Sequence, residues 1–209
     1  MPNSLLTPST LPFSLPDYAA ITDAHVREAL EAGLTEHLAE LDALAADTAP
    51  ATVENVLHAW ERSGATLDRT LSAFWVARSA DTNPERDAIM AEFSPRLAAH
   101  SDAILLNRGL YDRLRALADR AEAGEVTLDQ QDAFNLSERL RGYERGGITL
   151  GEQDQQRLRE LNGELATLSN QVEQRISDGR NAAGVHVTDE ARLAGLTADE
   201  KAALAAAAA

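Results

Sequence analysis

Histidines and carboxylates are the side chains of this 209-residue sequence that could bind a metal ion or transfer protons. Two histidines stand three residues before a glutamate, His37 before Glu40 and His58 before Glu61. Residues at this spacing share one face of a helix. A tetrahedral zinc ion needs more ligands, and the H-E-x-x-H pattern supplies two imidazoles on one face. Neither pair does so, and we predict that both are polar pairs at the surface or its boundary.

The remaining side chains form no other recognisable catalytic pattern. His25, His100 and His186 stand alone and are expected to be ordinary polar residues. Acid–base catalysis by carboxylates needs two of them in one pocket with different pKa values, and no pair stands out. No serine lies in a G-x-S-x-G turn, and no glycine cluster forms a phosphate-binding loop. The sequence therefore predicts no catalytic, cofactor-binding or metal-binding residue in this chain.

Three aromatic residues, Trp60, Phe74 and Trp75, lie near one another at helical spacings. A platform for an aromatic ligand is one interpretation of this group. Packing in the hydrophobic core is the favoured one, because large aromatic side chains dominate core packing.

The composition excludes several classes of function. With 19 basic and 34 acidic residues the formal charge is −15, which opposes binding to nucleic acid or to an anionic membrane. The absence of cysteine removes disulfides and thiolate chemistry, and it fits a reducing cytoplasm. No stretch reaches membrane-spanning length, and residues 1–16 contain no Lys or Arg, unlike a secretory leader. We expect a cytoplasmic protein whose partners include neither nucleic acid nor membrane.

Apolar residues at helical spacing predict about seven helices joined by short loops, so the fold class is mainly α, a multi-helix bundle or layered helical array. Pro95 is expected to kink or divide one of these helices. The predicted helix starts are Thr22, Thr52, Asn83-Pro84, Thr127 with Gln130, and Thr197 with Glu200.

One helix, from about Glu152 to about Asn181, is predicted to be much longer than the others. Its length far exceeds the mean of roughly 11 residues, so we expect it to span most of a domain as a packing spine. The apolar residues that share its one face are Leu158, Leu161, Leu165, Leu168, Val172 and Ile176.

The segment after this helix predicts a short strand and an unfinished helix. Residues 185–189 alternate in polarity and carry β-branched side chains, which favour an extended strand whose partner must come from elsewhere. The helix begun by Thr197 runs into the alanines at 205–209 without a glycine cap or a basic last turn. We therefore expect the chain to be part of a longer protein, and a natural frayed tail is the alternative. The predicted organisation is an extended arm at 1–20, a helical domain at 21–183, and the strand with the start of a truncated helix at 184–209.

Several segments resemble, in their order along the chain, those of a known enzyme family. They are Leu11-Pro12-Phe13, Ile21-Thr22-Asp23-Ala24-His25, Ser63-Gly64, Thr82-Asn83, Leu161 to Leu168, and Leu193 to Thr197. Together they resemble the N-terminal portion of the thimet oligopeptidase and neurolysin family of zinc metallopeptidases, on its bacterial peptidyl-dipeptidase and oligopeptidase A branch. The likeness covers essentially the whole chain. Val172 departs from the aromatic residue found near this position in some relatives, and peptidyl-dipeptidase looks closer than oligopeptidase A.

The resemblance implies a mostly helical enzyme in two halves, divided by a deep channel that admits short unfolded peptides. It also implies that the zinc ion, its ligands and the catalytic glutamate lie beyond residue 209. We therefore expect an inactive channel-wall fragment of a peptidase that removes C-terminal dipeptides from oligopeptides, with the C-terminal catalytic half as its partner. The alternative is a self-contained helical module that binds a protein through its leucine-rich faces.

Overall fold

The computed structural model describes residues 3–207, without the side chains of Asn181 and Ala207. The chain divides into two units, Met1–Asn170 and Gln171–Ala209, which we describe one at a time. The division falls inside one long helix. The predicted separation into an arm at 1–20, a helical domain at 21–183 and a C-terminal segment remains a proposal.

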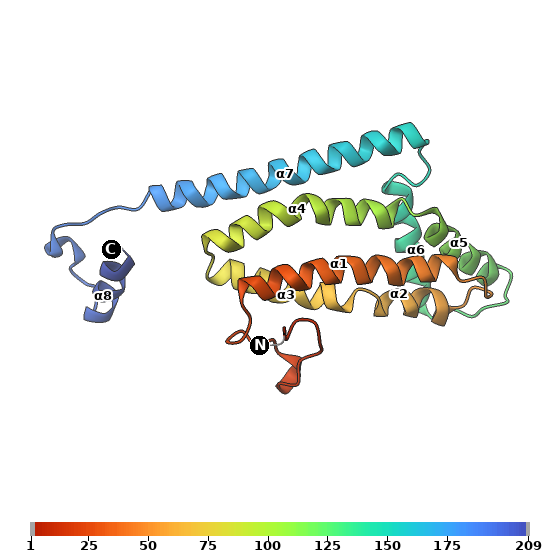
Figure 1. Cartoon of the computed structure of the whole chain (residues 1–209), viewed down its shortest axis with the longest axis horizontal. Coiled ribbons are helices and arrows are strands. Elements are labelled where there is room, and N and C mark those ends of the chain that lie inside the picture. Colours follow the sequence, from red (N-terminus) through yellow and green to blue (C-terminus); the bar gives the residue numbers. More distant parts are fainter. Residues whose placement is uncertain (1–2, 208–209) are drawn as a thin grey trace. The chain divides into compact units, whose positions relative to one another are not determined.

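The mainly helical fold class is confirmed (Figure 1). None of the described helices combines the length and the hydrophobicity that crossing a bilayer would require. The first unit contains the 3-10 helix η1 (Pro12–Ser14), α1 (Asp23–Ala46), the π-helix η2 (Val53–His58), α2 (Ala59–Arg62), α3 (Ala65–Ala80), α4 (Pro84–Leu105), α5 (Arg108–Glu122), α6 (Gln130–Arg145) and the first part of α7 (Glu152–Ala182). The second unit contains the rest of α7, η3 (Glu190–Leu193) and α8 (Ala198–Ala207).

Helix α1 is the packing axis of the first unit. Its N-terminal half packs against α3 and α4, and its C-terminal half packs against α5 and α2 (Figure 1). The first core cluster consists of Leu5, Val26, Ala29, Leu30, Leu34, Leu67, Ala73, Phe74, Ile89, Met90 and Phe93. The second consists of Leu41, Leu44, Ala51, Val56, Leu57, Leu110, Leu114, Leu117, Leu136, Tyr143 and Ile148. Because α1 contributes residues to both clusters, it joins them into one helical body.

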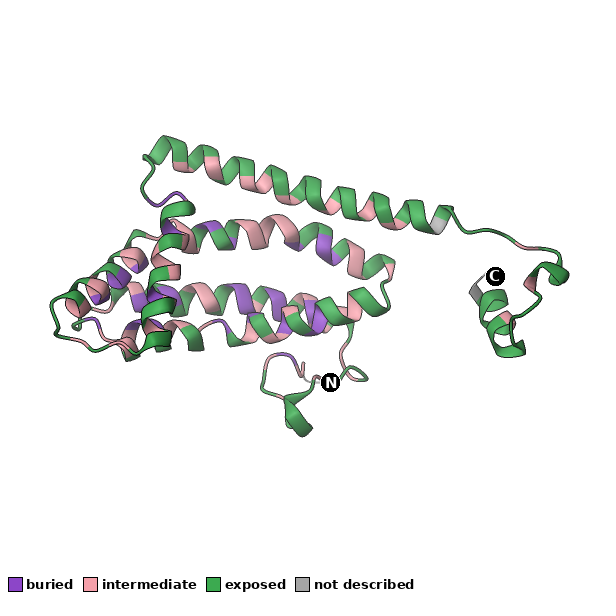
Figure 2. Ribbon diagram, turned by 180° about the vertical axis from the view of Figure 1, so that it is seen from behind, coloured by how far each residue is buried: buried purple, intermediate pink, exposed green. Residues whose placement is uncertain are grey.

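The long helix is confirmed as α7, but the expected packing role is not observed. No residue of α7 whose side chain is described is buried, and Figure 2 shows the helix largely exposed along its length. Leu165 and Leu168 are 62% and 57% exposed. Of the predicted apolar face, Leu158 is half-buried beside Asn162 and Ala166, whereas the leucine stripe formed by Leu161, Leu165 and Leu168 is exposed. The stripe therefore lies on a side of α7 that no other element of the first unit covers.

A buried polar contact ties α7 to α4. The Asn162 side chain donates a hydrogen bond to the Asp102 carboxylate at 2.7 Å, and Asp102 is only 7% exposed. Buried charged groups need such partners, since an unpaired one bears its full desolvation penalty. The amide of Asn162 therefore serves to position the first part of α7.

Asn162→Ala is expected to weaken the docking of α7 by about 1–3 kcal/mol, because it leaves the buried Asp102 carboxylate without this donor. Amide hydrogen exchange over residues 152–170 measures the effect as faster exchange. Ser169→Ala, at an exposed position of the same helix, is the matched control and should leave exchange unchanged. Equal exchange rates in the two variants would contradict this role of Asn162.

The prediction of a strand at 185–189 is wrong. Residues 184–188 carry no regular secondary structure, and residues 3–207 contain no strand that could pair with them. A lone strand leaves its N–H and C=O groups without partners, so the β-branched side chains alone do not produce one. The segment instead connects α7 to η3.

The predicted helix start at Thr197 is confirmed. The Glu200 carboxylate accepts hydrogen bonds from the Thr197 N–H and hydroxyl at 2.7 and 2.8 Å, and the Glu200 N–H donates to the Thr197 hydroxyl oxygen at 3.3 Å. The bond from the Thr197 backbone, followed by that from its hydroxyl, lowers the pKa of Glu200. Helix α8 continues to Ala207, and the last two predicted helical alanines lie outside the described residues.

Other helix starts differ in part from the predictions. Asn83 caps α4 as predicted, accepting a hydrogen bond from the Arg86 N–H at 2.8 Å. The cap of α6 is Asp129 rather than Thr127, because the Asp129 carboxylate accepts from the Asp132 N–H at 2.7 Å. A capping pattern in the sequence therefore locates a helix start to within a few residues.

Helix α4 runs through Pro95 without dividing.

Candidate functional site

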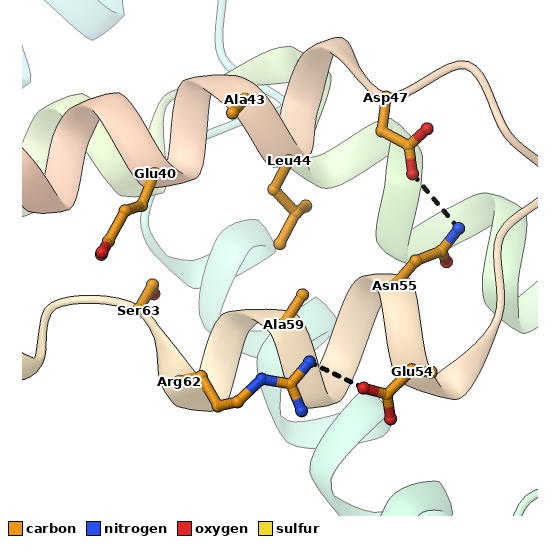
Figure 3. Close-up of a pocket in the computed structure, with 9 residues that line it drawn as sticks. All are labelled: Glu40, Ala43, Leu44, Asp47, Glu54, Asn55, Ala59, Arg62 and Ser63. Atoms are coloured by element: carbon orange, nitrogen blue, oxygen red, sulfur yellow. Dashed lines mark hydrogen bonds and ion pairs between the residues drawn. The ribbon is translucent and has the colours of Figure 1, made fainter.

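A recess of about 490 Å³ lies between the C-terminal part of α1 and the η2–α2 segment (Figure 3). The turn from α1 into η2 brings these elements together, with Thr52 capping η2 through the Asn55 N–H at 3.2 Å. The recess is lined by Glu40, Ala43, Leu44, Asp47, Glu54, Asn55, Ala59, Arg62 and Ser63.

The carboxylates of this recess are engaged by neighbouring donors. Asp47 accepts hydrogen bonds from Asn55 at 3.2 Å and from Arg113 at 3.0 Å. Glu54 pairs with Arg62 at 2.8 Å, and the Asp47–Asn55 and Glu54–Arg62 contacts are drawn in Figure 3. These partners hold the two carboxylates in place as parts of the wall.

Several polar groups of this recess are bonded to neighbouring groups of the protein. Its one hydroxyl, Ser63 Oγ, donates to the Trp60 carbonyl oxygen at 2.6 Å. Glu40 accepts from the Gly64 N–H at 2.7 Å. These partners fix the positions of the polar groups within the wall.

The members of both predicted His–Glu pairs form their hydrogen bonds with other partners. His58 contacts Glu54 at 3.0 Å and Asp132 at 3.5 Å, whereas Glu61 pairs with Arg139 and with Asn135. The bond to Glu54 is the main cause of the raised pKa of His58, and the same bond lowers the pKa of Glu54. Glu61 has a lowered pKa, first because of Arg139. His58 and Glu61 are thus polar surface contacts with different partners.

His37 and His100 form a pair that sequence reasoning missed. His37 Nδ1 lies 3.0 Å from His100 Nε2, and His100 is 8% exposed. The prediction that His100 is isolated is therefore wrong. The two residues are 63 positions apart and come from α1 and α4, so no local spacing could have signalled the contact.

The other singled-out residues have structural roles. His25 completes the cap of α1, where its N–H donates to the Thr22 hydroxyl at 3.2 Å. Trp60 packs edge-on against Tyr143 in the second cluster, with ring centroids 6.0 Å apart, whereas Phe74 is buried in the first cluster. The favoured interpretation of the aromatic residues as core is confirmed for Phe74, and the group does not form one platform.

The described residues do not fit a bound zinc ion. Within residues 3–207, no three His, Asp or Glu side chains lie close enough together to hold a metal. The facing nitrogens of His37 and His100 are engaged with each other. No step of a zinc-dependent reaction is therefore assigned to residues of this chain.

Comparison with known proteins identifies peptidase relatives. The chain is 35% identical over 198 residues to the dipeptidyl carboxypeptidase of Salmonella typhimurium and 33% identical to that of Escherichia coli. Each match covers 95% of this chain and 29% of the relative. Oligopeptidase A of S. typhimurium is 32% identical over 196 residues, which is 94% of this chain and 28% of that protein. No family model matches the sequence.

The chain therefore spans less than a third of the length of the curated relatives that it matches, while nearly all of it takes part in each match. The identities to two dipeptidyl carboxypeptidases and to oligopeptidase A agree with the family that the ordered sequence segments indicated. By sequence, this chain matches the N-terminal region of the peptidases that include dipeptidyl carboxypeptidase and oligopeptidase A.

Proposed function

We propose that this chain is the helical, non-catalytic part of a zinc metallopeptidase that hydrolyses short peptides by removing C-terminal dipeptides. Its helices would form a wall of the channel that leads to the metal, and the wall would select which peptides enter. Contacts with parts of the peptide remote from the cleaved bond would contribute binding energy to catalysis. The partners in this proposal are oligopeptide substrates and the C-terminal catalytic part, and the compartment is the cytoplasm.

This proposal rests on the sequence matches, which cover nearly all of this chain but less than a third of each relative. About 95% of the chain aligns with dipeptidyl carboxypeptidases, yet more than two thirds of each relative lies outside the match. The zinc ion and the catalytic residues would come from the part outside the match.

The exposed leucine stripe of α7 is also consistent with a second candidate function. Leu161, Leu165 and Leu168 leave an apolar surface in contact with solvent. Such a surface is typical of a protein-binding face. A stand-alone helical module that binds another protein would also have this feature, so the stripe does not separate the two functions.

The chain by itself is expected to hydrolyse no peptide and to retain no stoichiometric zinc. The test incubates the purified 209-residue chain with an unblocked oligopeptide, follows dipeptide release by mass spectrometry, and measures bound metal by elemental analysis. The same chain treated with a chelator is the control. Dipeptide release that the chelator abolishes would overturn the assignment of a non-catalytic role.

The coding sequence distinguishes the two candidates. A reading frame that continues past Ala209 and encodes H-E-x-x-H supports the peptidase, and release of C-terminal dipeptides by the product of that frame completes the test. A stop codon directly after Ala209 favours the binding module instead.

A further inference from the structure

The hydrogen bond between His37 and His100 requires that one of the two facing nitrogens carries no hydrogen. The two facing nitrogens are 3.0 Å apart, and the ring centroids are 5.0 Å apart with planes inclined at 47°. At this distance one nitrogen donates a hydrogen and the other accepts it through its lone pair. A second proton on the facing atoms would leave two donors and no acceptor.

This histidine pair lies where three elements meet. His37 comes from α1 and His100 from α4, and the turn between α2 and α3 packs against the His37 ring. In that turn Gly64 has a φ of +73°, and a Cβ atom on it would lie 2.9 Å from His37 Nδ1. The Gly64 N–H donates to Glu40 at 2.7 Å. A displacement of the His37 ring would therefore affect α1, α4 and this turn together.

The charged groups around the pair act unequally on its two rings. Burial lowers the pKa of His37, while Glu40 on α1 and Asp68 on α3 oppose that effect. Burial also lowers the pKa of His100, and the nearby His37 lowers it further. Asp102, two residues further along α4, is bonded to Asn162. The neutral form of the pair is thus the one that the folded protein favours.

We propose that His37 and His100 form a proton-sensitive contact between α1 and α4, which we call the clasp. The clasp holds while a single hydrogen lies between the two facing nitrogens, and it opens when acid protonates both imidazoles. The proposal rests on the contact geometry and is independent of the proposed function. Two imidazolium ions at this distance repel each other, and neither facing nitrogen retains a lone pair.

The direction of the pH effect follows from the number of protons that the folded and the unfolded chain bind. In the unfolded chain both histidines take up protons near their ordinary pKa of about 6.5. The folded pair takes up at least one proton fewer, so its contribution to stability is fully present above about pH 6.5 and is lost as the pH falls below that value. With a difference of one bound proton, the ratio of folded to unfolded protein changes about tenfold per pH unit.

The main test compares urea unfolding at pH 7.5 to 5 for the wild-type chain and for the double variant His37→Gln/His100→Gln. The glutamines retain an amide hydrogen bond but do not titrate. Below about pH 6.5, we expect the folded-to-unfolded ratio of the wild type to fall about tenfold more per pH unit than that of the double variant. Titration of His58 contributes equally to the pH dependence of stability in both proteins, so it cancels in the comparison. His186→Gln, at an exposed position, should follow the wild type.

The same pH dependence in the wild type and the double variant would overturn the proposal. A second measurement on the wild type covers the case in which the double variant does not fold. In a ¹⁵N NMR titration of the imidazoles, the His37 and His100 rings should both become imidazolium ions only at a pH below the ordinary histidine pKa of about 6.5. Independent titration of both rings near that value, with the α1–α4 contacts intact, would also overturn the clasp.

Discussion

Phe74→Ala is expected to lower the free energy of unfolding by about 3–5 kcal/mol. Phe74 is 1% exposed and lies on α3 within the cluster that α1, α3 and α4 share. Removing its ring takes away buried apolar surface and leaves a cavity among packed helices, and both effects destabilise the fold. Urea denaturation followed by circular dichroism measures the change.

The matched control for this prediction is Val76→Ala, two residues further along α3. Val76 is 55% exposed, so its truncation removes little buried surface, and we expect a change within about 0.5 kcal/mol. If the two variants unfold at the same urea concentration, the cluster around Phe74 does not hold the helices together as the structure indicates.

Gly33→Val is expected to lower the free energy of unfolding by about 3 kcal/mol, at the upper end of the usual cost of overpacking. Gly33 lies on α1 against α3, where a Cβ atom would come within 2.8 Å of both the N and Cα atoms of Leu67. Those neighbours are backbone atoms, and they move only if the whole helix moves. The valine would therefore push α1 and α3 apart, and urea denaturation measures the loss.

Gly142→Val provides the control for this substitution. Gly142 also lies inside a helix, α6, but nothing comes within 4 Å of a Cβ atom placed there. Glycine and valine differ only slightly in helix propensity, so we expect a change within about 0.5 kcal/mol. Equal destabilisation by the two valines would show that helix propensity, and not the contact with Leu67, decides the outcome at position 33.

The local features of the fold were predictable from the sequence because short-range contacts produce them. The caps at Asn83 and Thr197 involve side chains and backbone groups three residues apart. The long helix was predicted at 152–181 and is observed as Glu152–Ala182, because apolar periodicity and capping act within a few turns. The missed cap at Asp129 shows that two acceptable capping residues close together compete, and the sequence does not rank them.

The candidate site was less predictable than the helices. The recess of Figure 3 combines residues of α1 with residues of η2 and α2, and its shape depends on the turn between them. Arg113, which donates to Asp47 in its wall, is 66 residues away from that carboxylate. Periodicity carries no information on such pairings, because it describes one helix at a time. The family, by contrast, was indicated by the order of short segments along the chain.

The sequence by itself determined that this chain is mainly helical, where most helices begin, and which peptidase family it resembles. These properties depend on residues within a few turns of one another or on their order along the chain. Only the tertiary structure decided that α1 is the packing axis, that the leucine stripe of α7 is exposed, that residues 185–189 form no strand, and that His37 meets His100. Each of these depends on which distant segments share a surface, and packing free energy selects that arrangement over the whole chain.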